Sequence, residues 1–227
     1  MIPGSTYHLF NHANGRENLF SEPKNYEFFL GRLFMHVLPV AHLYAYCLMP
    51  NHFHILLKIR DEEVLTKYFI SGKELVDAGS DAILQKPVKE IDGELLIKKI
   101  SKSFSNLFNS YTQAYNKMYD RRGSLFIPNM KRKEVNNDGS FCKVVHYIHS
   151  NPVHHQFVKA IDKWPHSSYQ IFLSKGSTKL DRQYVLDIFG GLDWFIKYHQ
   201  QPIDPKDKFL ESCLELMEGF KPSKSLV

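Results

Sequence analysis

Cysteines, long apolar segments and a charged leader are scarce or absent in this 227-residue chain. Only three cysteines occur (Cys47, Cys142 and Cys213), and their wide scatter indicates reduced thiols rather than disulfides or a metal site. No apolar run approaches the roughly 18 residues of a membrane span, so we expect no membrane partner. The first residues lack the basic and apolar segments of a secretion signal. These absences favour a cytoplasmic protein.

Glycine-rich phosphate-binding loops are also missing, so we expect no nucleotide cofactor. The length fits one large domain or one domain with an appendage, and hydrophobic residues make up 43% of the chain, enough for a sizeable core. A net charge of +5 and a pI near 8.9 suit a nucleic-acid partner without requiring one. The basic residues gather in clusters, for which a solvated surface is the alternative: Lys98, Lys99, Lys102, Lys117, Arg121, Arg122, Lys131, Arg132 and Lys133.

Hydrophobic periodicity predicts the order strand, helix, strand, strand, helix, helix, strand, helix. The predicted segments are 7–12, 22–37, 41–48, 52–59, 62–69, about 96–121, 125–135 and 141–150. An α+β fold with a ferredoxin-like (RRM-like) antiparallel sheet and helices on one face accounts for this order most economically. We expect a main domain at 1–169, with a partly helical insertion at about 72–94. Two or three short helices would form a C-terminal accessory region at 170–227.

Two histidines interrupt the otherwise apolar stretch Leu-Met-Pro-Asn-His-Phe-His-Ile-Leu-Leu at 48–57. Side chains alternate along a strand, so His52 and His54 point to the same face while Phe53 and Ile55 point to the other. Two imidazoles side by side can share a metal ion. A structural role is the alternative for such a pair.

The helix predicted from Phe141 has two distinct faces. Its apolar face should pack against the sheet, and a second flank carries Lys143, Tyr147 and Asn151 at steps of four. Ser140 is a candidate N-cap. Pro152 disfavours helical geometry at the preceding residue, so we expect Asn151 at the fraying end of the helix, with its amide able to turn toward a ligand.

Four segments together resemble a known family. They are Met-Pro-Asn-His-Phe-His-Ile-Leu-Leu at 49–57, Arg-Arg-Gly-Ser-Leu-Phe at 121–126, Tyr-Ile-His-Ser-Asn-Pro-Val at 147–153 and Trp-Pro-His-Ser-Ser-Tyr at 164–169. In this order they resemble the single-tyrosine HUH transposases, most of all the REP-associated tyrosine transposases. The resemblance runs from about Tyr7 to Tyr169, and it makes 1–169 the catalytic domain.

The resemblance implies roles for four residues. His52 and His54 would be the metal-binding pair, and Tyr147 would be the nucleophile. Many relatives in the wider group have a glutamine as third ligand where this chain has Asn151, which would bind the metal directly or through water. Three rival tyrosines precede the Arg-Arg-Gly segment and do not match the nucleophile block: Tyr111, Tyr115 and Tyr119.

The implied activity is that of a metal-dependent transposase and endonuclease. It would nick and rejoin single-stranded hairpin DNA through a 5′-phosphotyrosine intermediate, with Mg²⁺ or Mn²⁺ as cofactor and a cytoplasmic, nucleoid-associated location. Candidate DNA contacts are Lys143, Arg121, Arg122, Lys131, Arg132 and Lys133. We expect the other histidines, including His146, His149, His154 and His155, at the surface or against DNA, with a second metal site among them as an alternative. Both a monomer and a homodimer remain open.

Two other functions compete with this reading. A non-catalytic protein that binds DNA hairpins would have no need of His52, His54 and Tyr147 together. A metal-dependent hydrolase of small phosphodiesters predicts acidic metal ligands, and none is seen near the histidine pair.

Overall fold

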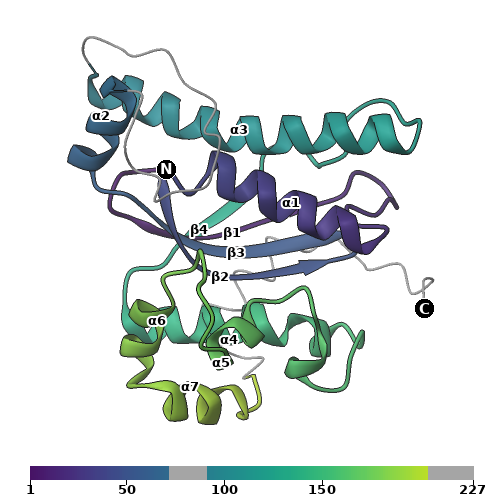
Figure 1. Ribbon diagram of the computed structural model, residues 1–227, viewed down its shortest axis with the longest axis vertical. Coiled ribbons are helices and arrows are strands. Elements are labelled where there is room, and N and C mark those ends of the chain that lie inside the picture. The colour runs from purple at the N-terminus through teal and green to yellow at the C-terminus, as the bar shows by residue number, and fades with distance from the viewer. Residues whose placement is uncertain (72–90, 204–227) are drawn as a thin grey trace.

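A four-stranded antiparallel sheet organises the chain, with the strand order β2-β3-β1-β4 (Figure 1). The computed structural model describes residues 1–71 and 91–203. The strands are β1 (Thr6–His12), β2 (Ala41–Met49), β3 (His52–Ile59) and β4 (Lys131–Glu134). This order, with helices between β1 and β2 and between β3 and β4, is the ferredoxin-like arrangement, so the predicted α+β fold class is confirmed.

Helices cover both faces of the sheet. Figure 1 shows α1 (Pro23–His36) and α3 (Gly93–Met118) side by side on one face, with α2 (Glu62–Ser71) beside the start of α3. The opposite face carries α4 (Asp138–His154), which packs mainly on β2 and β3. The prediction of helices on one face holds for α1 and α3, and α4 adds a layer on the second face.

The β2–β3 hairpin fixes which side chains of β3 face which helices. Met49 pairs with His52 across the two-residue turn at Pro50 and Asn51, as predicted. Phe53 points to the first face, where its ring lies 5.3 Å from that of Phe29 on α1. Because side chains alternate, His52 and His54 point to the face that α4 covers.

Helix α4 differs from its predicted limits. The N-cap is Asn137 and not the predicted Ser140, which lies in the first turn: the Asn137 side-chain oxygen accepts a hydrogen bond from the Ser140 backbone N–H at 2.8 Å. The helix continues through Pro152 to His154, so the prediction that it frays at Asn151 is wrong. Proline removes only its own N–H from the last turn, and the next bond still forms, from the His155 N–H to the Asn151 carbonyl at 2.9 Å.

Short helices after α4 form a further layer beside and beneath it (Figure 1). They are η1 (Ile161–Lys163), α5 (Tyr169–Leu173), α6 (Arg182–Phe189) and α7 (Leu192–His199). Backbone bonds tie this layer to β2, from the Leu48 N–H to the His166 carbonyl and from the Asp181 N–H to the Leu43 carbonyl, both at 2.9 Å. The boundary at 169/170 stays a prediction.

Some of the residues discussed above lie outside the described ranges. Of the insertion expected at about 72–94, only 91–94 is described, and α3 begins there at Gly93. Cys47 and Cys142 are free thiols, whereas Cys213 lies outside the described residues. Within 1–71 and 91–203, no helix has the length and apolar character needed to cross a membrane.

Candidate active site

His52 and His54 lie next to each other on the face of β3 that α4 covers, with ring centroids 5.2 Å apart. Nδ1 of His52 is 2.8 Å from the side-chain oxygen of Asn51. Because an amide oxygen can only accept, the imidazole donates this bond, and its Nε2 keeps the lone pair. His54 turns Nδ1 toward Nε2 of His8, at 3.1 Å. Its own Nε2 is buried and has no hydrogen-bond partner within the described part of the chain.

Asn151 approaches the pair from α4. Its Oδ1 is 3.4 Å from Nε2 of His52, so two atoms that both carry lone pairs face each other. Its Nδ2 is buried and has no hydrogen-bond partner among the described residues. Rotating the amide would let Nδ2 donate to His52 and would satisfy both groups without a metal. A cation shared by the two lone pairs would also satisfy them, since ligand atoms about 2.1 Å from one ion lie roughly 3.0–3.4 Å apart.

The donor set fits a divalent transition-metal ion. Two imidazole nitrogens and an amide oxygen suit Mn²⁺ and its neighbours better than Mg²⁺, which prefers oxygen ligands. Within 1–71 and 91–203 there is no group of three or more His, Cys, Asp or Glu side chains placed to hold a metal. A metal held by the two histidines would therefore also need the Asn151 oxygen, and water or a substrate oxygen would complete its coordination.

Tyr147 joins the site one helical turn before Asn151. Its ring meets His54 edge-on, with centroids 5.4 Å apart, and meets His8 at 5.9 Å. The four residues predicted to act together thus converge where α4 crosses β3. None of them is more than 3% exposed, so a polynucleotide reaches the phenol only if neighbouring side chains move.

Burial keeps the site histidines neutral. It lowers the pKa of His52 to about 3, with smaller contributions from His155 and His12, and it lowers the pKa of His54 well below its ordinary value. The pKa of His8 also falls to about 3, first through burial and then through the nearby charge of Lys133. A neutral imidazole is the form that binds metal, so these shifts favour a metal-binding role at neutral pH.

Three further histidines surround the pair and were missed or misplaced by sequence reasoning. His8 and His12 extend from β1, where His12 pairs with His52 and stacks on its ring at a centroid distance of 5.8 Å. His155 lies edge-on to His52 at 5.1 Å and is half-buried rather than a surface residue. The signal for His8 and His12 was their spacing of four within a predicted strand, which places both on one face.

The remaining histidines do not extend this site. His154 is exposed as predicted, but His146 and His149 are buried, so their prediction as surface residues is wrong. His149 lies 2.9 Å from a His199 nitrogen and 2.7 Å from the Ser168 hydroxyl, and these bonds hold α4 to the layer beneath it. No metal-binding group is found around them in the described ranges.

The tyrosines on α3 have structural roles. Tyr111 is buried, donates a hydrogen bond to the Leu19 carbonyl, and has a pKa raised far above its ordinary value by burial. Tyr115 is buried as well, with its hydroxyl 2.7 Å from that of Ser21. Neither lies on the α4 face of the sheet, which leaves Tyr147 as the tyrosine beside the histidines.

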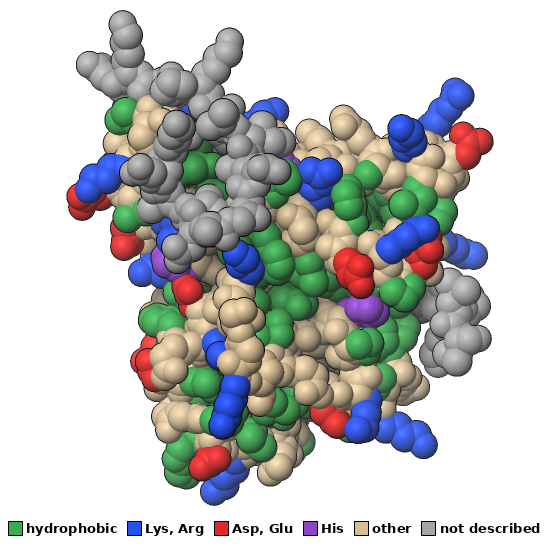
Figure 2. Space-filling view, viewed as in Figure 1, with side chains coloured by type: hydrophobic (Ala, Val, Ile, Leu, Met, Phe, Trp, Pro, Cys, Tyr) green, Lys and Arg blue, Asp and Glu red, His purple; other side chains and the backbone are tan. Residues whose placement is uncertain are grey.

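The candidate DNA contacts are distributed around the molecule. Lys143 is exposed one turn before Tyr147, and Arg122 is exposed after α3. Arg121 instead forms an ion pair with Glu17 and donates to the Ser124 carbonyl, so it stabilises the turn after α3. On the face seen in Figure 2, Lys and Arg side chains lie scattered among Asp and Glu. The described side chains visible on that face therefore form no single basic patch.

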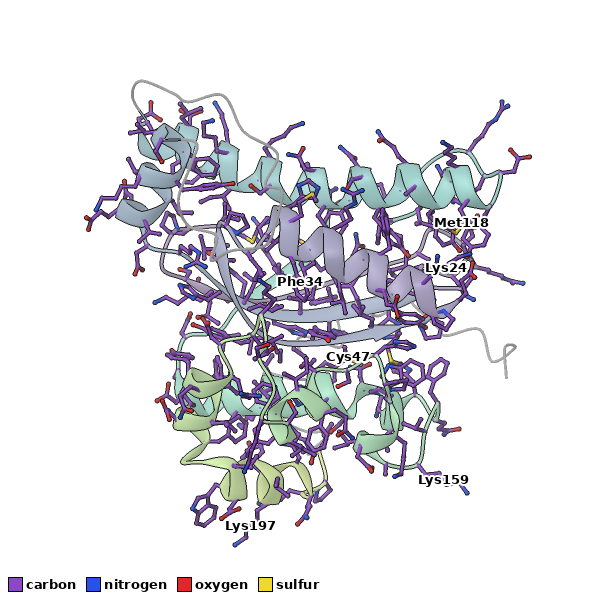
Figure 3. All side chains as sticks on the ribbon, in the orientation of Figure 1. Lys24, Phe34, Cys47, Met118, Lys159 and Lys197 are labelled. Atoms are coloured by element: carbon purple, nitrogen blue, oxygen red, sulfur yellow. The ribbon has the colours of Figure 1, made fainter. Side chains whose placement is uncertain are left out.

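Strand β4 divides its three basic residues between the two faces of the sheet. Lys131 pairs with Phe10 and Lys133 with His8, so both side chains point to the face of the histidine site. Arg132 pairs with Leu9 and points to the face of α1 and α3. Cys47, the β2 residue opposite His54, marks the boundary between the sheet and the α4 layer in Figure 3.

Comparisons with known proteins leave the chain without an assigned family. No family model and no curated protein matches it. Among solved structures, a REP-associated tyrosine transposase bound to a REP hairpin is similar to it, at 18% identity and a TM-score of 0.49. The similarity covers 77% of this chain and 82% of that one. The case for a function therefore rests on the site that His52, His54, Tyr147 and Asn151 form.

Proposed function

We propose that this protein is a metal-dependent tyrosine transposase and endonuclease, which nicks and rejoins single-stranded hairpin DNA through a 5′-phosphotyrosine. The observation that carries the proposal is the convergence of one phenol, two neutral imidazoles and one amide where α4 crosses β3. The proposal includes a cytoplasmic, nucleoid-associated setting. It holds for a monomer or for a homodimer.

Each site residue has a distinct part in this chemistry. His52, His54 and Asn151 would hold Mn²⁺ or Mg²⁺, and a bound divalent ion stabilises the negative charge that develops on a phosphoryl group. With a metal on Nε2 of His54, its Nδ1 would carry the proton and would donate to Nε2 of His8, 3.1 Å away, which would direct the Nε2 lone pair into the site. The helical spacing of Tyr147 and Asn151 places the nucleophile on the same flank as the amide.

The covalent step exchanges one phosphoester for another. The Tyr147 oxygen forms a bond to phosphorus, the bond from phosphorus to the 3′ oxygen of the preceding nucleotide breaks, and that oxygen leaves as a hydroxyl. The phenolic proton passes to solvent water, and the 3′ oxygen takes up a proton. Phenolate is a better leaving group than an alkoxide, because its conjugate acid, with a pKa near 10, is a stronger acid than an alcohol. The tyrosyl ester therefore stays reactive toward a second 3′ hydroxyl, which permits strand joining without a nucleotide.

A covalent-complex assay tests the proposal. The full chain is incubated with Mn²⁺ and single-stranded oligonucleotides that cover hairpins flanking its gene, and denaturing gels then detect protein that carries DNA. We expect an adduct with wild type, none with Tyr147→Phe, and an unchanged yield with the control Tyr119→Phe, which alters an exposed tyrosine at the end of α3. An adduct with Tyr147→Phe would contradict the assignment.

The second candidate is a non-catalytic protein that binds DNA hairpins, which the closed state of the site favours. It predicts tight binding of the same hairpins on native gels, no adduct with any metal, and equal affinity for wild type and Tyr147→Phe.

A further inference from the structure

A groove of about 640 Å³ runs between α3 and the segment at 124–132, on the sheet face opposite Tyr147. One wall is a stripe of uncharged polar side chains at steps of three and four along α3: Ser101, Ser105, Asn109 and Thr112. Its size is within the range of sites that hold small ligands or single nucleotides. Hydroxyl and amide groups can both donate and accept, as the edges of nucleobases require.

The rest of the groove combines aromatic rings with positive charge. Phe104, Phe108 and Phe126 line it, and the rings of Phe108 and Phe126 lie 5.0 Å apart. Arg132 lies in the wall opposite the α3 stripe, and no Asp or Glu is among the described residues that line the groove. Aromatic surfaces beside a guanidinium suit an anionic chain of flat rings, which is the chemistry of a single nucleic-acid strand.

At the edge of the sheet the groove meets the surroundings of the histidine site. Asn11, Ile127 and Asn129 line the groove and also a separate small pocket, of about 10 Å³, that reaches His12 and His52. Strand β4 pairs with Tyr7–Phe10 of β1, and beyond Phe10 the Ile127 N–H donates to the His12 carbonyl at 3.0 Å, so the segment around Ile127 covers the continuing edge of β1. The Asn11 amide donates to the Ile127 carbonyl at 3.1 Å and holds that segment in place.

Two consecutive cations flank this crossing. Arg132 points to the α3 face, where it lines the groove, and Lys131 points to the other face, where it lines the pocket with His52. A phosphate backbone that turns around the edge would meet one cation on each side. Their arrangement complements a strand that passes from one face of the sheet to the other.

We propose that the single strand adjoining the cleaved phosphate lies in the α3 groove and reaches His52 across the sheet edge at Ile127 and Asn129. Bases contact the aromatic floor and the Asn109–Thr112 stretch of the wall, while Arg132 and Lys131 bind successive phosphates. The inference rests on the proposed function and assigns the residues that hold the unpaired part of its substrate.

Fluorescence anisotropy with the full chain tests the assignment. The two probes are a labelled DNA hairpin that carries ten unpaired thymidines and the same hairpin without them. Arg132→Gln and the double variant Asn109→Ala/Thr112→Val should each weaken binding of the extended probe roughly tenfold, since one charged or two neutral hydrogen bonds are lost. Neither change should affect the blunt hairpin. Arg132→Gln should also make the slope of log binding constant against log salt concentration less steep by about 0.7.

Matched controls separate these effects from general ones. Gln113→Ala changes an exposed neutral residue of α3 outside the groove, and Lys197→Gln removes a charge on α7, far from the sheet in Figure 3. Both should bind the extended probe as wild type does, and all variants should keep the wild-type melting temperature. Equal losses of affinity for both probes, or no loss for the extended probe, would contradict the assignment of the groove as the strand-binding surface and would leave the proposed function standing. If wild type binds neither probe, the proposed function fails together with the groove.

Discussion

Burial of neutral histidines should make the free energy of unfolding fall steeply in mild acid. Burial lowers the pKa of His8, His52 and His199 to about 3 each. In the unfolded chain the same side chains have a pKa near 6.5. Between these values the unfolded state binds protons that the folded state does not bind. Stability is therefore complete above about pH 6.5 and decreases as the pH falls toward 3.

The expected size follows from the linkage relation. Each pH unit below 6.5 lowers the free energy of unfolding by about 1.4 kcal/mol for each histidine that stays neutral only in the folded state. Lowering the pH from 7 to 5 should therefore cost about 2 kcal/mol for each of the three, or about 6 kcal/mol together. Domains are typically stable by only about 5–15 kcal/mol, so the loss should be large.

Urea unfolding followed by far-UV circular dichroism at pH 7 and pH 5, with EDTA present, measures this difference. His199→Gln keeps hydrogen-bonding capacity but cannot take up a proton, so the pH effect should shrink by about 2 kcal/mol. His154→Gln, at an exposed position, should leave the effect unchanged. A wild-type difference below about 1 kcal/mol would refute the claim that these imidazoles are buried and neutral.

Three further perturbations test the site and the core. His8→Phe removes the acceptor 3.1 Å from His54 Nδ1 and should weaken Mn²⁺ binding about 10- to 100-fold, as measured by calorimetry. The control His8→Gln should retain most of the affinity. Equal affinities for the two variants would contradict the role of His8 in positioning His54. Asn151→Asp places a carboxylate beside His52 Nε2 and should tighten Mn²⁺ binding by roughly tenfold, and an unchanged titration would remove Asn151 from the ligand set. Phe53→Ala empties a fully buried site and should lower the free energy of unfolding by about 3–5 kcal/mol, so a urea midpoint equal to that of wild type would show that the core is packed differently.

The order of helices and strands was predictable because each element carries its own periodicity. The three- and four-residue apolar steps in α3 identify that helix, and the short apolar run of β3 directly after the Pro50-Asn51 turn identifies that strand, without tertiary information. The limit of α4 was not predictable from Pro152 alone, because a proline in a last turn is tolerated when the bonds around it still form.

The site was predictable only where its residues share one element. His52 and His54 share a strand, and Tyr147 and Asn151 share a helical flank, so short-range spacing relates each pair. The contribution of His8 depends on the register of β1 against β3, which joins residues 46 positions apart and cannot be read from spacing. For the same reason, the sequence could not show which of the consecutive residues Lys131 and Arg132 shares the face of the histidine site, although strand alternation places them on opposite faces.

The central claim is that Tyr147 is the nucleophile, and mass spectrometry of the trypsin-digested covalent complex tests it most directly. Cleavage after Lys143 and Lys159 yields the peptide 144–159, in which Tyr147 is the only tyrosine. We predict that the nucleotide mass resides on this peptide and on Tyr147 within it. A nucleotide on the peptide 103–117, which contains Tyr111 and Tyr115, would contradict the account.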